Sequence, residues 1–222
     1  MSYFPDPVDR RNEWFRYYSE KRVTHQWLQV NLLKDLKNVH SVLEIGPYLG
    51  LVSSLLHNAG FNVTTLDYQP SQYPHPDIKL IQKDLLDASP AEIQGFDCII
   101  CCETLEHFFW DDVDKLLEKF YLSKAPWVVI SVPYQGFQID LSLYLNRYKL
   151  RNSFSMKNFK FLKKFCFDSK ADPYGHKWEV GYKKRSVKML EAKIRRAGFS
   201  IETREFTSAC RSIFFVLKNN GV

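Results

Sequence analysis

The chain has 222 residues, 45% of them hydrophobic, and a formal net charge of +6. This length and apolar content suffice for one α/β core, so we expect a single domain over residues 1–222. The sequence lacks an apolar run approaching the ~20 residues of a membrane-spanning helix. Its charged, aromatic start also lacks the apolar segment of a signal peptide. We therefore expect a cytoplasmic protein whose residues 1–40 form an N-terminal helical cap.

Residues 41–70 predict one strand–helix–strand unit. A short apolar run ends at Gly46, Gly50 opens a helix with apolar residues at helical spacing, and the next strand ends at Asp67. Glycine permits close approach of a ligand to the backbone, and a helix N-terminus offers free N–H groups. An acid at the end of the second strand can accept from two ribose hydroxyls. This unit predicts a site for a nucleoside-containing cofactor.

The glycine spacing distinguishes between cofactors. A dinucleotide site of the G-x-G-x-x-G type needs a third glycine that is missing here. Glu44, Gly46 and Gly50 instead resemble motif I of the class I S-adenosylmethionine (SAM) methyltransferases, with Tyr48 in place of the middle glycine of E-x-G-x-G-x-G. The resemblance implies that SAM is the cofactor. The cofactor-binding residues that it implies are Glu44, Gly46, Tyr48, Gly50, Asp67, Tyr68, Asp84 and Glu103.

The pattern continues along the chain. Asp84 follows the third strand, where the family places an acid near the adenine amine, although a loop aspartate is by itself usually just solvated. The resemblance covers residues 41–217 and implies a Rossmann-like α/β fold. Its sheet is mostly parallel and seven-stranded, with an antiparallel closing strand, helices on both faces and an insertion after strand five. Further strands are expected at 78–81, 96–102, 127–132, 199–206 and 212–217, and helices at 23–36, 111–121 and 186–197.

The cysteines predict no disulfide framework. Their number is odd, five, and they follow no regular spacing. Cys98 and Cys101 form a C-x-x-C sequence, but it lies in a predicted strand, where residues three apart point to opposite faces. We expect reduced thiols in the core.

A Glu/His cluster follows the fourth strand. Glu103, Glu106 and His107 fall within one helical turn, and His176 is a fourth candidate ligand. These oxygen and nitrogen donors suit a divalent ion such as Mg²⁺, Mn²⁺ or Zn²⁺, which would lower the pKa of an acceptor hydroxyl. The E-x-x-E-H pattern with a distant histidine resembles small-RNA 3′-end 2′-O-methyltransferases and metal-assisted O-methyltransferases of the ubiquinone pathway.

The cluster also has two readings without a metal. In one, Glu106 and His107 orient the next helix, and His176 contacts the acceptor or the cofactor. In the other, His176 is an ordinary loop histidine. With or without a metal, His107 and His176 are the candidate general bases, because an imidazole titrates near neutral pH, and the expected catalytic residues are Glu106, His107 and His176.

The insertion after strand five is basic and aromatic. Residues 137–170 contain eight Lys or Arg against two acids, together with eight aromatic rings. We expect residues 137–175 to form a lid over the acceptor. The partners that fit are RNA, an anionic membrane surface, and a small acidic or glycan-type acceptor. Alternatively, the rings pack onto the domain while the lysines are solvated. DNA is not expected, and the sequence leaves the oligomeric state open.

The segment 175–182, GHKWEVGY, resembles methyltransferases of cell-surface glycan biosynthesis. It favours O-methylation of a small-molecule, glycan or lipid-linked acceptor by a cytoplasmic or peripheral membrane enzyme. The alternatives are a metal-dependent RNA 2′-O-methyltransferase and a non-catalytic SAM-fold scaffold protein, which the substitution at Tyr48 leaves open.

Overall fold

The computed structural model describes residues 7–70, 75–157 and 165–222. Each strand and helix expected from residue 41 onward is present, with ends shifted by a few residues. The strands of the main sheet are β1 (Ser41–Ile45), β2 (Asn62–Asp67), β3 (Lys79–Gln82), β4 (Cys98–Cys102), β5 (Trp127–Pro133), β8 (Phe199–Thr207) and β9 (Ser212–Asn219). The helices are α1 (Pro7–Tyr17), α2 (Glu20–Asn31), α3 (Leu51–Asn58), α4 (Asp112–Leu122) and α5 (Val187–Arg196), with short 3₁₀ turns η1 (Pro90–Ile93) and η2 (Leu105–His107).

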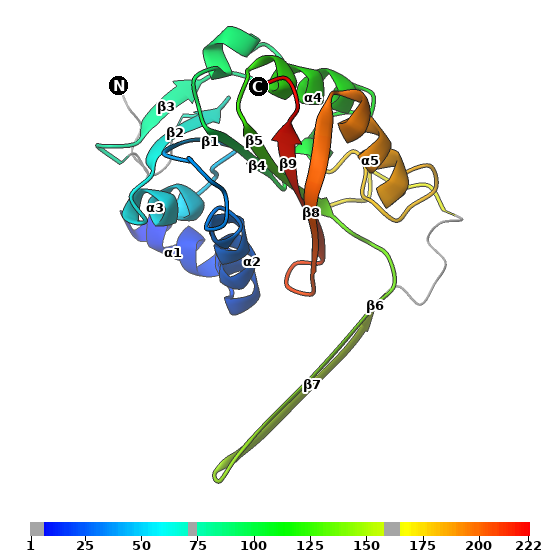
Figure 1. Ribbon diagram of the computed structural model, residues 1–222. Helices are drawn as coiled ribbons and strands as arrows, with labels where there is room; N and C mark the ends of the chain where they lie inside the picture. Colours follow the sequence, from blue (N-terminus) through cyan, green and yellow to red (C-terminus); the bar gives the residue numbers. More distant parts are fainter. Residues whose placement is uncertain (1–6, 71–74, 158–164) are drawn as a thin grey trace.

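The main sheet has seven strands in the order β3-β2-β1-β4-β5-β9-β8 (Figure 1). The first five strands of the chain pair in parallel, and β9 lies antiparallel between β5 and β8. This is the predicted Rossmann-like sheet with its antiparallel closing strand. Because the parallel strands end at one edge, the loops that follow β1, β2 and β4 meet there.

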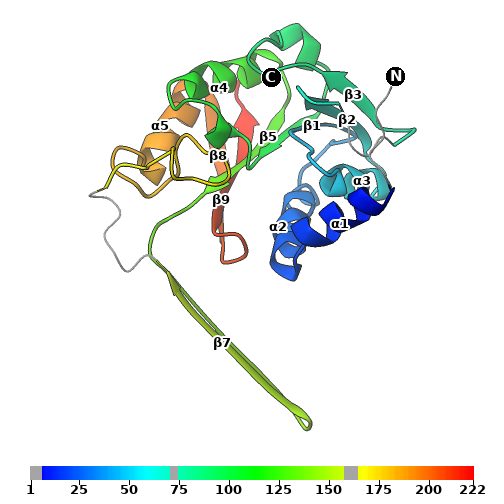
Figure 2. The ribbon, with the colours of Figure 1, turned by 180° about the vertical axis from the view of Figure 1, so that it is seen from behind.

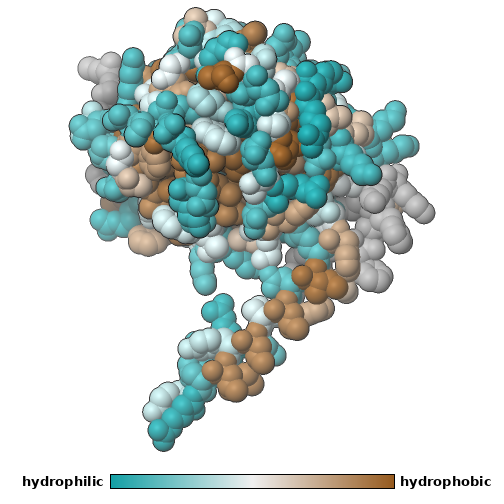
Figure 3. Space-filling view, viewed as in Figure 1, coloured by the Kyte–Doolittle hydropathy of each residue, from teal (hydrophilic) through white to brown (hydrophobic). Residues whose placement is uncertain are grey.

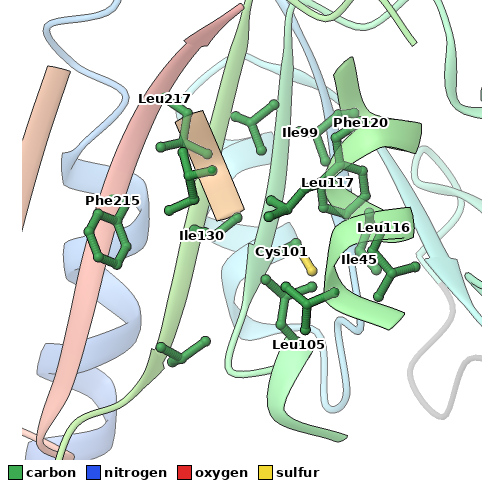
Figure 4. Packing of buried hydrophobic residues seen from close by; sticks show 14 of the residues in the cluster. Ile45, Ile99, Cys101, Leu105, Leu116, Leu117, Phe120, Ile130, Phe215 and Leu217 are labelled. Carbon is green, nitrogen blue, oxygen red and sulfur yellow. The ribbon is translucent and has the colours of Figure 1, made fainter. Parts of the chain in front are cut away.

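Two hydrophobic cores lie on opposite faces of the sheet. Figures 1 and 2 show α4 and α5 on one face and α1, α2 and α3 on the other. Figure 4 shows the first core, in which Phe120 and Leu117 of α4 meet Ile99 and Cys101 of β4. Cys98 belongs to the second core, beside residues of α2 and α3. The two thiols therefore point to opposite faces and are free, as predicted.

Helix α2 begins and ends earlier than expected. The helix predicted at 23–36 begins at Glu20, because the Ser19 hydroxyl caps it by accepting from the Arg22 amide at 3.3 Å. It ends at Asn31, where a tighter turn follows and the Leu33 amide donates to the Val30 carbonyl at 3.0 Å.

The first part of the insertion, for which the sequence predicted no secondary structure, forms a β-hairpin. β6 (Gln138–Asn146) and β7 (Lys149–Lys157) pair only with each other and project from the body (Figure 1). Five residues that contributed to the predicted basic, aromatic character lie outside the described residues: Phe159, Lys160, Phe161, Lys163 and Lys164. In the described part of the chain, every helix is too short or too polar to cross a membrane.

Asp97 anchors the start of β1 from the residue before β4. Its carboxylate oxygen accepts from the amides of His40 (2.9 Å) and Ser41 (2.8 Å) and from the Ser41 hydroxyl (2.9 Å). Partial burial raises the pKa of Asp97, but the bonds from Ser41 and His40 outweigh it and lower the pKa overall. Because the pKa of Asp97 is lower in the folded state, its ionised carboxylate stabilises the fold at any pH above the pKa of an unfolded aspartate.

We predict that Asp97→Ala lowers the free energy of unfolding by about 1–3 kcal/mol at pH 7, since three donors lose their acceptor. The difference from wild type shrinks as the pH falls through the lowered pKa, where the wild-type carboxylate is protonated. Denaturant unfolding at pH 7 and pH 3 measures both. Asp35→Ala, at an exposed aspartate, is the control, and an equal loss in the two variants would contradict the anchoring role.

Candidate active site

The loop after β1 requires glycine at both ends. Gly46 has φ +72°, and a Cβ there would lie 2.8 Å from the Thr104 hydroxyl oxygen. Gly50 has φ +74° and is the N-cap of α3, with open space where its Cβ would be. The loop therefore runs close to the residues after β4 and leads directly into a helix N-terminus, which is suited to bind a ligand carboxylate or phosphate.

Glu44 lies on β1, two residues before Gly46. It is 4% exposed, and its carboxylate accepts from the Ser53 hydroxyl in the first turn of α3. Burial raises the pKa of Glu44 to about 7. This hydrogen bond joins the end of β1 to the first turn of α3, so Glu44 fixes the two ends of the loop relative to each other.

Tyr48 has a φ of +48°, in the left-handed region that favours glycine. Its hydroxyl donates to Glu13 at 3.0 Å, and its ring lies 4.5 Å from the Tyr17 ring, both on α1. Burial and the Glu13 bond raise the pKa of Tyr48 to about 12. The side chain thus contacts the N-terminal cap, and the substitution is accommodated in the loop.

Two acids follow β2 and β3 at the same edge. Asp67 is half-buried and accepts from the Gln69 amide at 2.9 Å, and burial raises its pKa. Its carbonyl accepts from the Lys83 amide at 2.8 Å, which brings the segment carrying Asp84 next to β2. Asp84 is exposed and closes a local turn by accepting from the Leu86 amide. Tyr68, 66% exposed, lies on the surface beside Asp67.

Glu103 lies on the inner side of the site. Its backbone has φ +50°, and its carboxylate accepts from the Ser131 hydroxyl at 2.7 Å. The nearest cation candidate is His25 of α2, whose Nε2 is 3.9 Å away. Burial lowers the pKa of His25 to about 4, so this imidazole is neutral. Partial burial raises the pKa of Glu103.

Glu106, in η2, is fully buried. Within the described chain neither carboxylate oxygen has a hydrogen-bond partner, and the nearest basic atom is Nε2 of His176 at 4.0 Å. Burial raises the pKa of Glu106 well above its usual value, and the Glu103 carboxylate adds to the effect. A buried acid without a donor is costly, so its position calls for a chemical explanation.

His176 is held by two acids that the sequence analysis did not assign. Its Nδ1 lies 3.0 Å from Glu179 Oε1 and 3.9 Å from Asp172 Oδ2, and both acids are nearly buried. The carboxylates favour the tautomer with the proton on Nδ1, which leaves the Nε2 lone pair toward Glu106. The His107 ring lies 5.1 Å from the His176 ring. Partial burial and the neighbouring His176 lower the pKa of His107.

The structure brings together three of the four candidate metal ligands. Ligand atoms of Glu106, His107 and His176 lie within 4.8 Å of one another, a group that does not include Glu103. The residues missed were Asp172, Glu179 and His25. The spacing of Asp172, His176 and Glu179, four and three residues apart, was a usable signal for the first two. His25 had none, because only the fold brings α2 to this edge.

Comparisons with known proteins agree with the fold. A family model described as "Methyltransferase domain" matches residues 9–171. One similar solved structure is the N-methyltransferase NodS from Bradyrhizobium japonicum WM9 in complex with S-adenosylhomocysteine. It has a TM-score of 0.61 and 14% identity, over 93% of this chain and 91% of that one. Another is the methyltransferase domain of bacterial CtHen1-CN, with a TM-score of 0.59 and 16% identity, over 89% and 99%.

A third similar structure is the Burkholderia thailandensis 1,6-didemethyltoxoflavin-N1-methyltransferase, with a TM-score of 0.56 and 16% identity, over 96% of this chain and 83% of that one. At these identities the likeness shows the fold alone. No curated protein matches the sequence.

We predict that Glu106→Gln stabilises the chelator-treated protein by about 1–4 kcal/mol at pH 7. Burial raises the pKa of Glu106, so at this pH folding must keep or return a proton that an unfolded glutamate gives up, and the variant has no such cost. Thermal unfolding measures this as a rise in Tm of roughly 2–4 °C per kcal/mol. Glu118→Gln, at an exposed glutamate of α4, is the matched control and leaves Tm unchanged. A lower Tm for Glu106→Gln would mean that the carboxylate is satisfied in the folded protein.

Proposed function

The chain belongs to the family of methyltransferase domains, and from this membership we propose that it transfers a methyl group from SAM to an oxygen atom of a small-molecule, glycan or lipid-linked acceptor. One observation carries the proposal. The glycine loop after β1, the acid after β2 and the Glu/His cluster after β4 lie at the same edge of the sheet, where open α/β folds bind their ligands.

The residues at this edge fit SAM. Gly46 and Gly50 leave the backbone accessible, so the loop and the first turn of α3 would hold the methionine part. Asp67 has one carboxylate oxygen engaged by Gln69 and would hold the ribose, and Asp84 would lie near the adenine. When bound, SAM supplies an electrophilic methyl group on a sulfonium.

The acceptor side requires positioning, exclusion of water and removal of a proton. His176 Nε2 is the atom that would accept the proton of a hydroxyl acceptor, because Glu179 engages Nδ1. His107, whose pKa is lowered, is a second neutral imidazole at the same place. Glu103 and its partner Ser131 lie toward the β4 end and would orient the acceptor or the cofactor.

We predict that Asp67→Asn weakens SAM binding about 10- to 100-fold, because a charged acceptor of hydrogen bonds becomes neutral without a change of shape. Isothermal calorimetry with SAM measures the change. Asp87→Asn, at an exposed aspartate near β3, is the control and keeps wild-type affinity. An unchanged affinity in Asp67→Asn would assign the ribose to other residues. A wild type that does not bind millimolar SAM would favour the scaffold alternative.

A second candidate function is metal-assisted methyl transfer. The observation that favours it is the buried Glu106 carboxylate without a donor in the described chain, facing His176. A histidine whose other nitrogen donates to a carboxylate is typical of metal ligands, and Glu179 has that position here. Glu106, His107 and His176 would hold the ion, with Glu103 on the inner side. A divalent ion supplies a Lewis acid that lowers the pKa of an acceptor hydroxyl.

We predict that Mn²⁺ or Zn²⁺ raises the Tm of the chelator-treated wild type, since an ion that binds only the folded protein stabilises it. Glu106→Gln and His176→Ala lose the rise, and Glu118→Gln retains it. Bound metal is measured in parallel by elemental analysis. If the wild type neither retains nor responds to an ion, the site has no metal, and His176 stays the candidate base.

The proposed acceptor, an oxygen atom of a small molecule, glycan or lipid-linked compound, has two alternatives. Solved structures with a similar fold include two N-methyltransferases, NodS and the toxoflavin enzyme, so a nitrogen acceptor is the first alternative to oxygen. RNA 2′-O-methylation is the second. Incubation of the protein with labelled SAM and cell extract, fractionated into small molecules, lipids and RNA, distinguishes them. Label confined to RNA would overturn the small-molecule or glycan acceptor.

A further inference from the structure

The β6–β7 hairpin has one apolar and one polar face. Residues directly opposite in an antiparallel pair share a face, so the register assigns the side chains. One face carries seven apolar side chains and one asparagine: Ile139, Leu141, Leu143, Leu145, Leu150, Asn152, Phe154 and Met156. The other face is polar, with residues such as Ser142, Ser153 and Arg151. Figure 3 shows the apolar side chains along one side of the ribbon.

The described residues of the body do not cover this apolar face. Leu141 is 74% exposed, Leu143 and Leu145 are each 70% exposed, and Phe154 is 66% exposed. Isolated apolar residues on a surface are ordinary, but a contiguous row of this length marks an interaction site. A two-stranded hairpin is also only marginally stable alone in water. The face therefore requires an occupant.

We propose that the hairpin docks the protein on an anionic membrane surface, with the apolar face against the acyl chains. Charge favours this occupant. Between residues 138 and 156 the basic residues Arg147, Lys149 and Arg151 oppose one acid, Asp140, a net charge of +2 from three minus one. Arg147 lies in the turn at the tip, beside Lys149 at the start of β7. Anionic headgroups attract such residues.

The dimensions of the ribbon fit this position. Each strand has nine residues, so the ribbon is about 30 Å long and about 10 Å wide. Interfacial segments sink their apolar face ~5–10 Å into the membrane surface. A ribbon lying flat at that depth keeps its unpaired strand edges and polar face at the level of the headgroups, where water is available. Tyr144 and Tyr148 near the tip are of the residue type that prefers this layer.

A second copy of the chain fits less well. Face-to-face pairing would bring together two arms that each have a net charge of +2 between residues 138 and 156. An anionic membrane surface instead attracts that charge. The charge therefore favours a lipid surface.

The inference goes beyond the proposed function and does not depend on it, because attachment is measured without SAM. Sedimentation with phosphatidylcholine vesicles, with or without phosphatidylglycerol, is the assay. We expect the wild type to bind the anionic vesicles at least about tenfold more than the neutral ones. Leu141→Ser with Phe154→Ser, a directly opposite pair, lowers this binding about tenfold or more. The matched control is Ser142→Ala with Ser153→Ala, the next pair on the polar face, which keeps wild-type binding.

Three results would overturn the inference. One is equal, weak sedimentation of the wild type with both kinds of vesicle. Another is binding that survives Leu141→Ser with Phe154→Ser but is lost in Arg147→Gln, Lys149→Gln, Arg151→Gln, since charge alone would then attach the protein. The third is a dimer in analytical ultracentrifugation that the same apolar double variant dissociates, which would assign the face to a second copy. Calorimetry with SAM confirms that every variant is folded and tests the proposed function separately.

Discussion

The close approach of the loops after β1 and β4 determines the arrangement of the site. The Thr104 hydroxyl lies within hydrogen-bond distance of the carbonyls of Ile45 (3.3 Å) and Cys102 (3.0 Å), and so joins the ends of both strands. A side chain at Gly46 would collide with that hydroxyl. Glycine is therefore required there by a neighbouring side chain as well as by its own backbone angle. The same contact fixes the cofactor loop relative to η2 and its acids.

The two buried glutamates next to this contact differ in their surroundings. Glu44 has the Ser53 hydroxyl as a donor, so its burial is part of how β1 and α3 are joined. Among the described residues, Glu106 has no hydrogen-bond donor, and the Nε2 of His176 lies 4.0 Å from its carboxylate. An acid in the first situation stabilises local structure, whereas one in the second destabilises the fold unless a cation or a proton accompanies it. The contrast explains why the chemistry is assigned to the η2 side of the contact.

Most of the fold could be predicted from the sequence because its signals are local. The apolar runs, Gly46, Gly50 and the acid ending β2 lie within thirty residues and reflect one supersecondary unit. The Glu/His cluster was harder to predict, since Glu106 and His176 are far apart in the chain. They meet because the segment that follows the hairpin returns to the body of the protein. His25 was missed because only the fold brings α2 to Glu103. The alternating leucines of β6 indicate a strand with one apolar face, but the charged and aromatic residues of the same region directed the interpretation toward a lid.

The insertion combines two separable parts. The segment that follows the hairpin and carries His176 is fixed to the body. The Lys177 amide donates to the Glu106 carbonyl at 2.7 Å, and the Trp178 indole donates to the Phe108 carbonyl at 3.1 Å. Trp178 is buried against the Trp110 ring, which explains how His176 can be held in place. In the described part of the chain, the hairpin strands β6 and β7 form a sheet with each other and not with the main sheet. A partner can therefore bind the hairpin without displacing His176, so that one insertion can serve both attachment and the reaction.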